Sequence, residues 1–326
     1  MKMSLTLIAI MALLTVAGCR KEESVVGPAP DAPPAGVTNE TTAMQSLAVN
    51  DPFVRNDEQT FNDAEVAPQE YGNFGAKVAA EITPLRHGRF ITSITRQVTV
   101  TIDSSDTTAV ALVEKTIIGT FRIRGINDAG DTVTIDKPFT DSSKRQIYFK
   151  RVARDRDHYW ENWRPVSASL VAGGTVAPND HVSIVEIETF LPNGDSISVT
   201  DPLNTFLRYK WIAGWHMGRR DVPVFLPGQE IRTRVTVLSD SPDTDNVVLR
   251  FGYDGYHKRR VKFQLLSSTD NGDGTFMRVY ERIWYANLHA GYFHAGVEAM
   301  TRGTIRDDAA PYSVSWWGMP YRVVVL

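Results

Sequence analysis

From about residue 85 onward, apolar and polar side chains alternate along one short segment after another. Within residues 96–103, for example, Val98, Val100 and Ile102 fall on one face of an extended chain, and polar residues occupy the other face. A period of two residues is typical of half-buried antiparallel strands. Little in this region shows the 3.6-residue period of a long amphipathic helix, and only residues 75–81 suggest a short one. The pattern therefore predicts an all-β protein.

The expected strands fall into two sets that meet near residue 220. Turn-rich pieces such as Asn127–Gly130 separate successive strands, because Asn, Asp and Gly adopt the backbone angles that tight turns need. The first set lies at 96–103, 117–124, 131–138, 145–152, 164–172, 182–190 and 195–200, and the second at 223–226, 231–237, 247–253, 260–265, 275–284, 291–301 and 313–325. We therefore expect two antiparallel β-sandwich-type domains, one at 71–220 and one at 221–326.

The second set has the strand count of an immunoglobulin-like sandwich, about seven strands in some hundred residues. Its hairpin Asp270–Thr275 and its late strand Gly291–Thr301 resemble those of bacterial Ig-like domains. The resemblance is one of architecture and covers about a third of the chain. It implies that the C-terminal domain is Ig-like.

The N-terminus carries the pattern of an export signal. One lysine among the first four residues precedes the apolar run Leu5–Val16, which as a helix would be about 18 Å long, short of the ~30 Å hydrocarbon core. The next residues, Val16-Ala17-Gly18-Cys19, resemble the lipobox of bacterial lipoproteins. The resemblance implies that residues 1–18 form a cleaved signal peptide and that Cys19, the only cysteine, is the lipid attachment site. Arg20, where a retention signal would have Asp, favours the outer membrane.

Residues 19–70 predict a disordered tether behind the lipidated cysteine. Residues 20–70 contain ten acidic and three basic side chains, and the piece Gly27–Gly36 is rich in Pro and Ala. Such a composition cannot form a helix there and has little apolar surface to bury.

Composition and motifs exclude several classes of protein. With 35 basic and 38 acidic residues the net charge is −3, so no bulk positive field attracts nucleic acid. A single cysteine permits no disulfide within the chain and no Cys-based metal site. The glycine-rich loops, the nucleophile elbow and the zinc motifs of common enzyme families are missing from the sequence. We expect no cofactor, no metal, no nucleic-acid partner and no catalytic residues.

The densest mixture of acids, histidine and aromatics lies in residues 154–163 and is the first candidate ligand site. Asp157 and His158 have side chains that bind divalent metals or polar ligands, and Trp160 and Trp163 offer flat faces on which a sugar ring stacks. The neighbouring arginines neutralise the acids locally, and tryptophans that pack a loop against a sheet give the same pattern.

A second candidate is the pair Trp316 and Trp317 in the expected strand 313–325. Adjacent strand residues point to opposite faces, so one tryptophan should lie in the core and the other should face outward. An outward tryptophan suits a glycan or a protein partner, although sheet edges bury such residues too.

One fragment suggests catalysis. Glu186-Ile187-Glu188 places two carboxylates on one strand face and resembles the E-I-D-x-x-E strand of a jelly-roll glycosidase group. The third acid of that motif would fall at Leu191, so the set is incomplete. Two solvated glutamates on an exposed face explain the fragment better, and Asp157 with Glu161 is a further pair to consider.

These observations favour an exported, lipid-anchored envelope or surface protein at the outer membrane, on its periplasmic face or at the cell surface. Its role would be binding or structural, toward an envelope or surface protein. A carbohydrate- or cell-wall-binding lipoprotein that uses exposed tryptophans is the first alternative, and a glycan-active hydrolase is the second.

Overall fold

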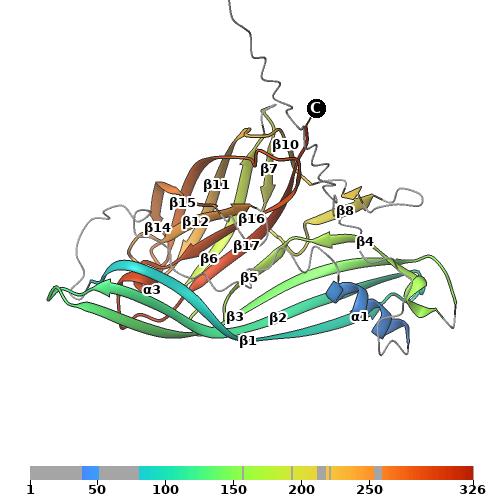
Figure 1. The fold of residues 1–326 in the computed structure, drawn as a ribbon, viewed down its shortest axis with the longest axis horizontal. Helices are drawn as coiled ribbons and strands as arrows, with labels where there is room; N and C mark the ends of the chain where they lie inside the picture. Colours follow the sequence, from blue (N-terminus) through green and yellow to red (C-terminus); the bar gives the residue numbers. More distant parts are fainter. Residues whose placement is uncertain are drawn as a thin grey trace, which may run out of the picture. The chain divides into compact units, whose positions relative to one another are not determined.

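Three long strands form an antiparallel ribbon along the bottom of Figure 1: β1 (Thr83–Ile102), β2 (Thr108–Ile126) and β3 (Thr132–Arg151). The computed structural model describes residues 39–50, 81–155, 158–191, 194–210, 218–219, 222–252 and 259–325. The sequence predicts two strands at 131–138 and 145–152, whereas β3 is continuous. The pattern breaks between them because the inward face of β3 carries buried polar residues, among them Lys137, Asp141 and Arg145.

Short polar turns connect the three strands. Asp103 directly follows β1, and its carboxylate accepts hydrogen bonds from the hydroxyls of Ser105 and Thr108 at 2.7 Å each, which lowers the pKa of Asp103. The predicted turn at Asn127–Gly130 is confirmed, with Gly130 at φ 87°. These turns fix the register in which β2 pairs with both neighbours.

The ribbon belongs to a larger sheet of twelve strands within the described residues. β5 pairs with β3 on one side and with β17 on the other, and the sheet continues through β16, β12 and β13. Its remaining strands are β4 (Trp163–Ser169), β5 (Val171–Thr175), β8 (Phe206–Lys210), β9 (Gly218–Arg219), β10 (Val224–Phe225), β12 (Asn246–Gly252), β13 (Arg259–Lys262), β16 (Gly291–Met300) and β17 (Val314–Val323).

A second, five-stranded antiparallel sheet faces the C-terminal part of the first. Its order is β14-β15-β11-β6-β7. The strands are β6 (Val182–Phe190), β7 (Ser196–Val199), β11 (Glu230–Ser239), β14 (Gln264–Asp270) and β15 (Phe276–Tyr285). The all-β, sandwich-type fold predicted from the alternation is confirmed.

Strands from both sides of residue 220 contribute to both sheets. In the smaller sheet β11 pairs with β6, and in the larger sheet β17 pairs with β5. The described residues all lie in one compact unit, Pro34–Leu326. The division expected between residues 220 and 221 therefore does not coincide with a division of the sheets, because long-range strand pairing joins segments that are far apart in the sequence.

Two groups of buried side chains hold these layers together. The larger fills the space between the two sheets and extends to β2, β3 and Trp163. The smaller lies between the opposite face of β17 and one end of the ribbon, and includes Phe121, Phe139, Tyr312 and Trp316. Strand β17 is therefore covered on both faces.

A helix lies inside the segment predicted to be a tether. α1 (Glu40–Asn50) packs on β1, β2 and β4 and buries Ala43, Met44 and Ala48. The expectation of a tether reaching to residue 70 is therefore wrong for this stretch, because apolar residues at helical spacing find a partner surface on the ribbon. Of the expected helix at 75–81, only Glu81 is described, and it forms an isolated bridge with Asp307.

The other helical pieces are short: η2 (Tyr159–Glu161), a single 3-10 turn, and α3 (Arg302–Arg306), which caps one end of the ribbon. None of the helices within the described ranges has the length and apolar character needed to cross a bilayer.

Candidate functional site

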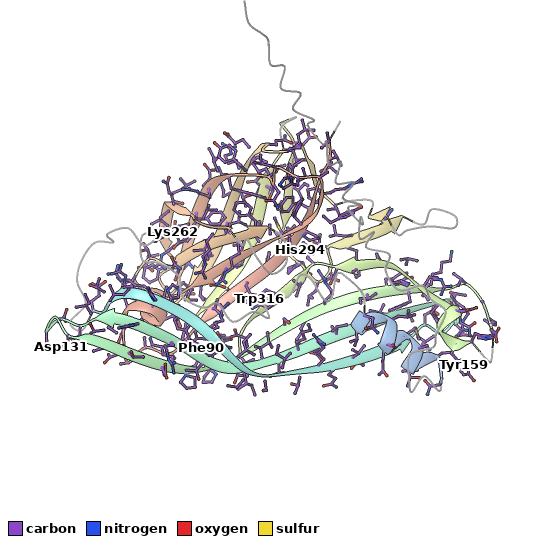
Figure 2. All side chains as sticks on the ribbon, in the orientation of Figure 1. Phe90, Asp131, Tyr159, Lys262, His294 and Trp316 are labelled. Carbon is purple, nitrogen blue, oxygen red and sulfur yellow. The ribbon has the colours of Figure 1, made fainter. Side chains whose placement is uncertain are left out.

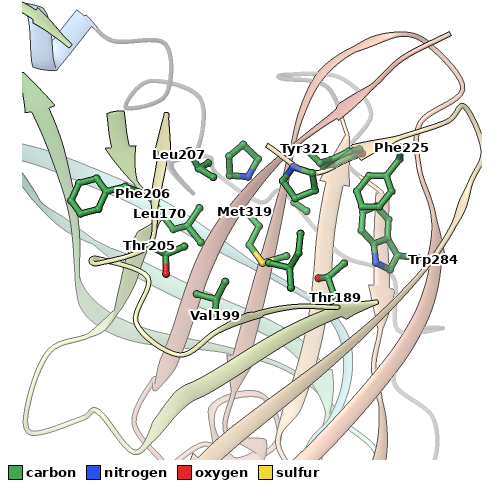
Figure 3. A pocket seen from close by; sticks show the side chains of 14 residues that line it. Leu170, Thr189, Val199, Thr205, Phe206, Leu207, Phe225, Trp284, Met319 and Tyr321 are labelled. Atoms are coloured by element: carbon green, nitrogen blue, oxygen red, sulfur yellow. The ribbon is translucent and has the colours of Figure 1, made fainter. Parts of the chain in front are cut away.

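A cavity of about 300 Å³ opens between the two sheets, at the end where β7, β8 and β10 meet β17 (Figure 3). Both sheets contribute to its wall, the smaller through β6, β7 and β15 and the larger through β8, β10, β16 and β17. The side chains that define its shape are apolar: Leu170, Leu207, Phe225, Trp284, Met319 and Tyr321.

Aromatic rings form one rigid wall of this cavity. Trp284 meets Tyr321 edge to face with ring centroids 5.5 Å apart, and Phe225 contacts both rings. The indole nitrogen of Trp284 donates a hydrogen bond to Thr233 Oγ1 at 2.9 Å. Because this polar atom already has a partner, the indole presents only its apolar surface to the cavity.

Two threonines are among the lining residues. The Thr205 hydroxyl donates to the backbone carbonyl of Asp201 at 2.7 Å. Thr189 is only 4% exposed, and its hydroxyl has no hydrogen-bond partner within the described part of the chain. None of the fourteen described residues that line the cavity is charged.

The size of the cavity is itself informative. Close-packed cores contain few voids larger than a water molecule. A cavity of about 300 Å³ therefore departs from ordinary core packing. Its volume also lies at the lower end of the range of ligand pockets, about 300 to 1,000 Å³.

Sequence reasoning did not find this cavity. Its residues come from seven strands and their flanking loops between Leu170 and Tyr321, and each one reads only as an ordinary core position. No local motif marks such a site, since it exists only after the two sheets have paired.

The structure does not gather the candidate residues of the 154–163 segment into a site. Asp157 and the side chain of Trp160 lie outside the described residues. His158 is half exposed, and its Nδ1 lies 3.0 Å from a carboxylate oxygen of Asp155. Trp163 is fully buried beneath the guanidinium group of Arg151, 4.4 Å from the ring centroid, so its face is not open to a sugar.

The expectation that Trp316 or Trp317 faces outward is wrong. The two rings do point to opposite faces of β17, but both are buried, with 1% and 7% of their surface exposed. Trp317 belongs to the core between the sheets, and Trp316 lies between β17 and the ribbon (Figure 2). The reason is that this strand has packing partners on both sides.

Glu186 and Glu188 lie on the outer face of β6. Glu186 accepts a hydrogen bond from the Ser198 hydroxyl at 2.6 Å, and Glu188 lies 3.5 Å from a guanidinium nitrogen of Arg234. Cys19 lies outside the described residues, as does most of the N-terminal segment. Across the described ranges, no group of three or more His, Cys, Asp or Glu side chains is arranged to hold a metal ion.

A buried polar network joins the ribbon to the sandwich. Glu298 on β16 accepts hydrogen bonds from Arg89 at 2.8 Å and from Arg250 at 3.1 Å. Burial alone would raise the pKa of Glu298, but the charges of Arg250, Arg89 and Arg260 outweigh it and hold the pKa well below its usual value. The side chains of Glu298, Arg89 and Arg250 are nearly inaccessible, so the network fixes the position of the strands.

The same network reaches Asp141 through the Tyr312 hydroxyl, which receives a hydrogen bond from Arg89 Nε at 2.7 Å and donates to Asp141 at 3.2 Å. Burial raises the pKa of Asp141 to about 6, although the charge of Arg89 and two hydrogen bonds oppose the shift. A carboxyl with such a pKa suits acid–base chemistry only in an open cleft. Asp141 is 3% exposed, so we assign it a structural role.

Comparisons with protein-family models, with curated proteins and with solved structures return no match for this chain.

Proposed function

We propose that this chain is a lipid-anchored protein of the bacterial cell envelope that acts by binding, through the cavity between its two sheets. The observation that carries the binding role is the apolar cavity of about 300 Å³ in an otherwise filled core. An envelope or surface partner would then reach the protein at the membrane to which it is anchored.

The N-terminal sequence supports the lipid anchor. Cys19 follows an export signal and small residues, and no second cysteine offers it a disulfide partner. Two or more acyl chains would make the attachment stable, since each buried CH₂ contributes about 0.8 kcal/mol. Residues 20–38 precede α1, and their composition predicts a spacer of at most about 60 Å at ~3.1 Å per residue.

The two alternative functions, glycan binding and glycan hydrolysis, have less support. The glycan-binding function needs exposed tryptophans, and the four tryptophan side chains that the structure describes, Trp163, Trp284, Trp316 and Trp317, are buried. A hydrolase would need its carboxylates in a cleft, whereas Glu188 forms an ion pair with Arg234 on the outer face of a strand.

The anchor is tested by feeding cells a clickable fatty acid and comparing the wild type with Cys19→Ala. We expect label on the wild-type protein in the membrane fraction, no label on the variant, and an outer-membrane position after gradient separation. Protease added to intact and to lysed cells then tells whether the sandwich faces the medium or the periplasm. An unlabelled wild-type protein would contradict the proposed anchoring.

A further inference from the structure

We infer that the cavity between the sheets binds one aliphatic chain, such as the chain of a fatty acid derivative, and leaves any polar head group at its open end. This inference rests on the proposed binding function and names the class of ligand. Two observations support it: the chemistry of the wall and the volume of the cavity.

The wall excludes ligands that carry many polar groups. Leu170, Phe225, Trp284, Met319 and Tyr321 face the cavity, and no described lining residue is charged. A sugar or a nucleotide would exchange its hydrogen bonds with water for apolar contacts, which is unfavourable. An aliphatic chain has no hydrogen bonds with water to lose, and its transfer from water to an apolar cavity is favourable. An ionised head group would have to remain at the open end.

The volume selects one chain rather than several. A cavity of about 300 Å³ stands at the lower limit for small-molecule sites. Met319 lies in the middle of the cavity wall in Figure 3, and its unbranched side chain adapts to occupants of different shape. A two-chain lipid would not fit inside.

The test measures binding by calorimetry with octan-1-ol, n-octane and maltose. The protein is the mature chain, from residue 19 with Cys19→Ala, freed of copurified lipid and of detergent. We expect both octyl compounds to bind, because the octyl chain leaves water in each case, and maltose not to bind.

Three variants locate the site. Met319→Trp fills the cavity and should weaken both ligands at least 10-fold. Ala295→Leu adds a smaller side chain to the same wall and should weaken both ligands as well. Leu266→Trp, at a 53% exposed position on β14, is the matched control and should change neither. Circular dichroism checks the folding of each variant, and Ala295→Leu decides if Met319→Trp fails to fold.

Several results would overturn the inference. These are maltose binding as tightly as octan-1-ol, unchanged binding of octan-1-ol in a folded cavity-filling variant, or no binding at all by the wild type. A negative result beside intact fatty-acid labelling in cells would refute the ligand class and leave the anchored envelope protein standing.

Discussion

Gly173 is required where it stands because the indole of Trp316 lies across it. The two residues pair between β5 and β17, and a Cβ atom built on Gly173 would overlap the six-membered ring of that indole. The ring is buried at the junction of the sandwich and the ribbon, so it has no room to move aside. At this position the absence of a side chain is what allows the two halves of the larger sheet to join.

Gly173→Ala should therefore lower the free energy of unfolding by about 1–3 kcal/mol, through overpacking. Urea unfolding measures the loss. In a Trp316→Leu background, where the smaller side chain leaves space, the same substitution should cost less. The double mutant should therefore lose less unfolding free energy than the sum of the two single losses. Equal losses in both backgrounds would contradict the steric explanation.

Asp141 makes stability depend on pH. Burial raises its pKa from 3.8 to about 6, so between these values the native state holds a proton that the unfolded state has released. The contribution of this proton to the free energy of unfolding is fully present below about pH 4 and is lost as the pH rises through 6. The total loss is about 3 kcal/mol. Hydrogen bonds from Thr175 and Tyr312 remain available throughout this range.

Asp141→Asn removes the ionisation and nearly preserves the shape. Relative to the wild type, the variant should gain about 2.4 kcal/mol of unfolding free energy between pH 4 and pH 7.5, because other titrating groups cancel in the difference. Urea unfolding at the two pH values measures this gain. A difference between the two proteins that does not change with pH would mean that Asp141 is not protonated near neutrality in the native state.

At the scale of elements, α1 is held by its first residues. Asn39 Oδ1 accepts a hydrogen bond from the Thr42 amide at 2.9 Å, and Thr42 Oγ1 accepts one from the Asn39 amide at 3.1 Å. Glu40 then forms a bidentate pair with Arg151 of β3, with distances of 2.5 and 2.6 Å. This pairing lowers the pKa of Glu40 and ties the start of the helix to the ribbon.

Asn39→Ala should cost about 1 kcal/mol of helix stability and raise amide hydrogen exchange in residues 43–50 about fivefold. Exchange in β6 and β11 should stay the same, because these strands do not touch the helix. The control is Thr41→Ala, an exposed neighbour that loses a similar number of atoms without losing the cap. Faster exchange across the whole chain would show that α1 is not a separate element of stability.

Local patterns predicted the strands better than the helix or the site. The strand expected at 182–190 has those bounds in the structure, because its alternation is unbroken and turns flank it. Buried polar residues on one face hid the continuity of β3, and α1 escaped notice inside a segment dominated by Pro, Ala and acidic residues. The burial of Trp317 and the cavity both depend on which layers come together, which no local pattern contains.

At the scale of the whole molecule, neither half of the chain has a complete set of strand partners. β6 lies between β7 and β11, so a fragment that ends at residue 220 leaves one of its edges open. In the same fragment β5 lacks its partner strand β17, and the buried face of the ribbon lacks the side chains of Tyr312 and Trp316. An open edge and an uncovered apolar face favour aggregation over folding.

Fragments 81–220 and 221–326 should therefore each fail to unfold cooperatively when expressed alone, because neither contains its partners across the two sheets. The chain from residue 39 to 326 should show a single transition that fluorescence and circular dichroism report together. Coexpression of the two fragments should restore part of the native spectrum, since the missing pairs are intermolecular in that mixture but otherwise unchanged. A cooperative transition in either fragment alone would mean that it stabilises itself without the shared sheets, and the larger sheet would then be an assembly of two independently folding parts.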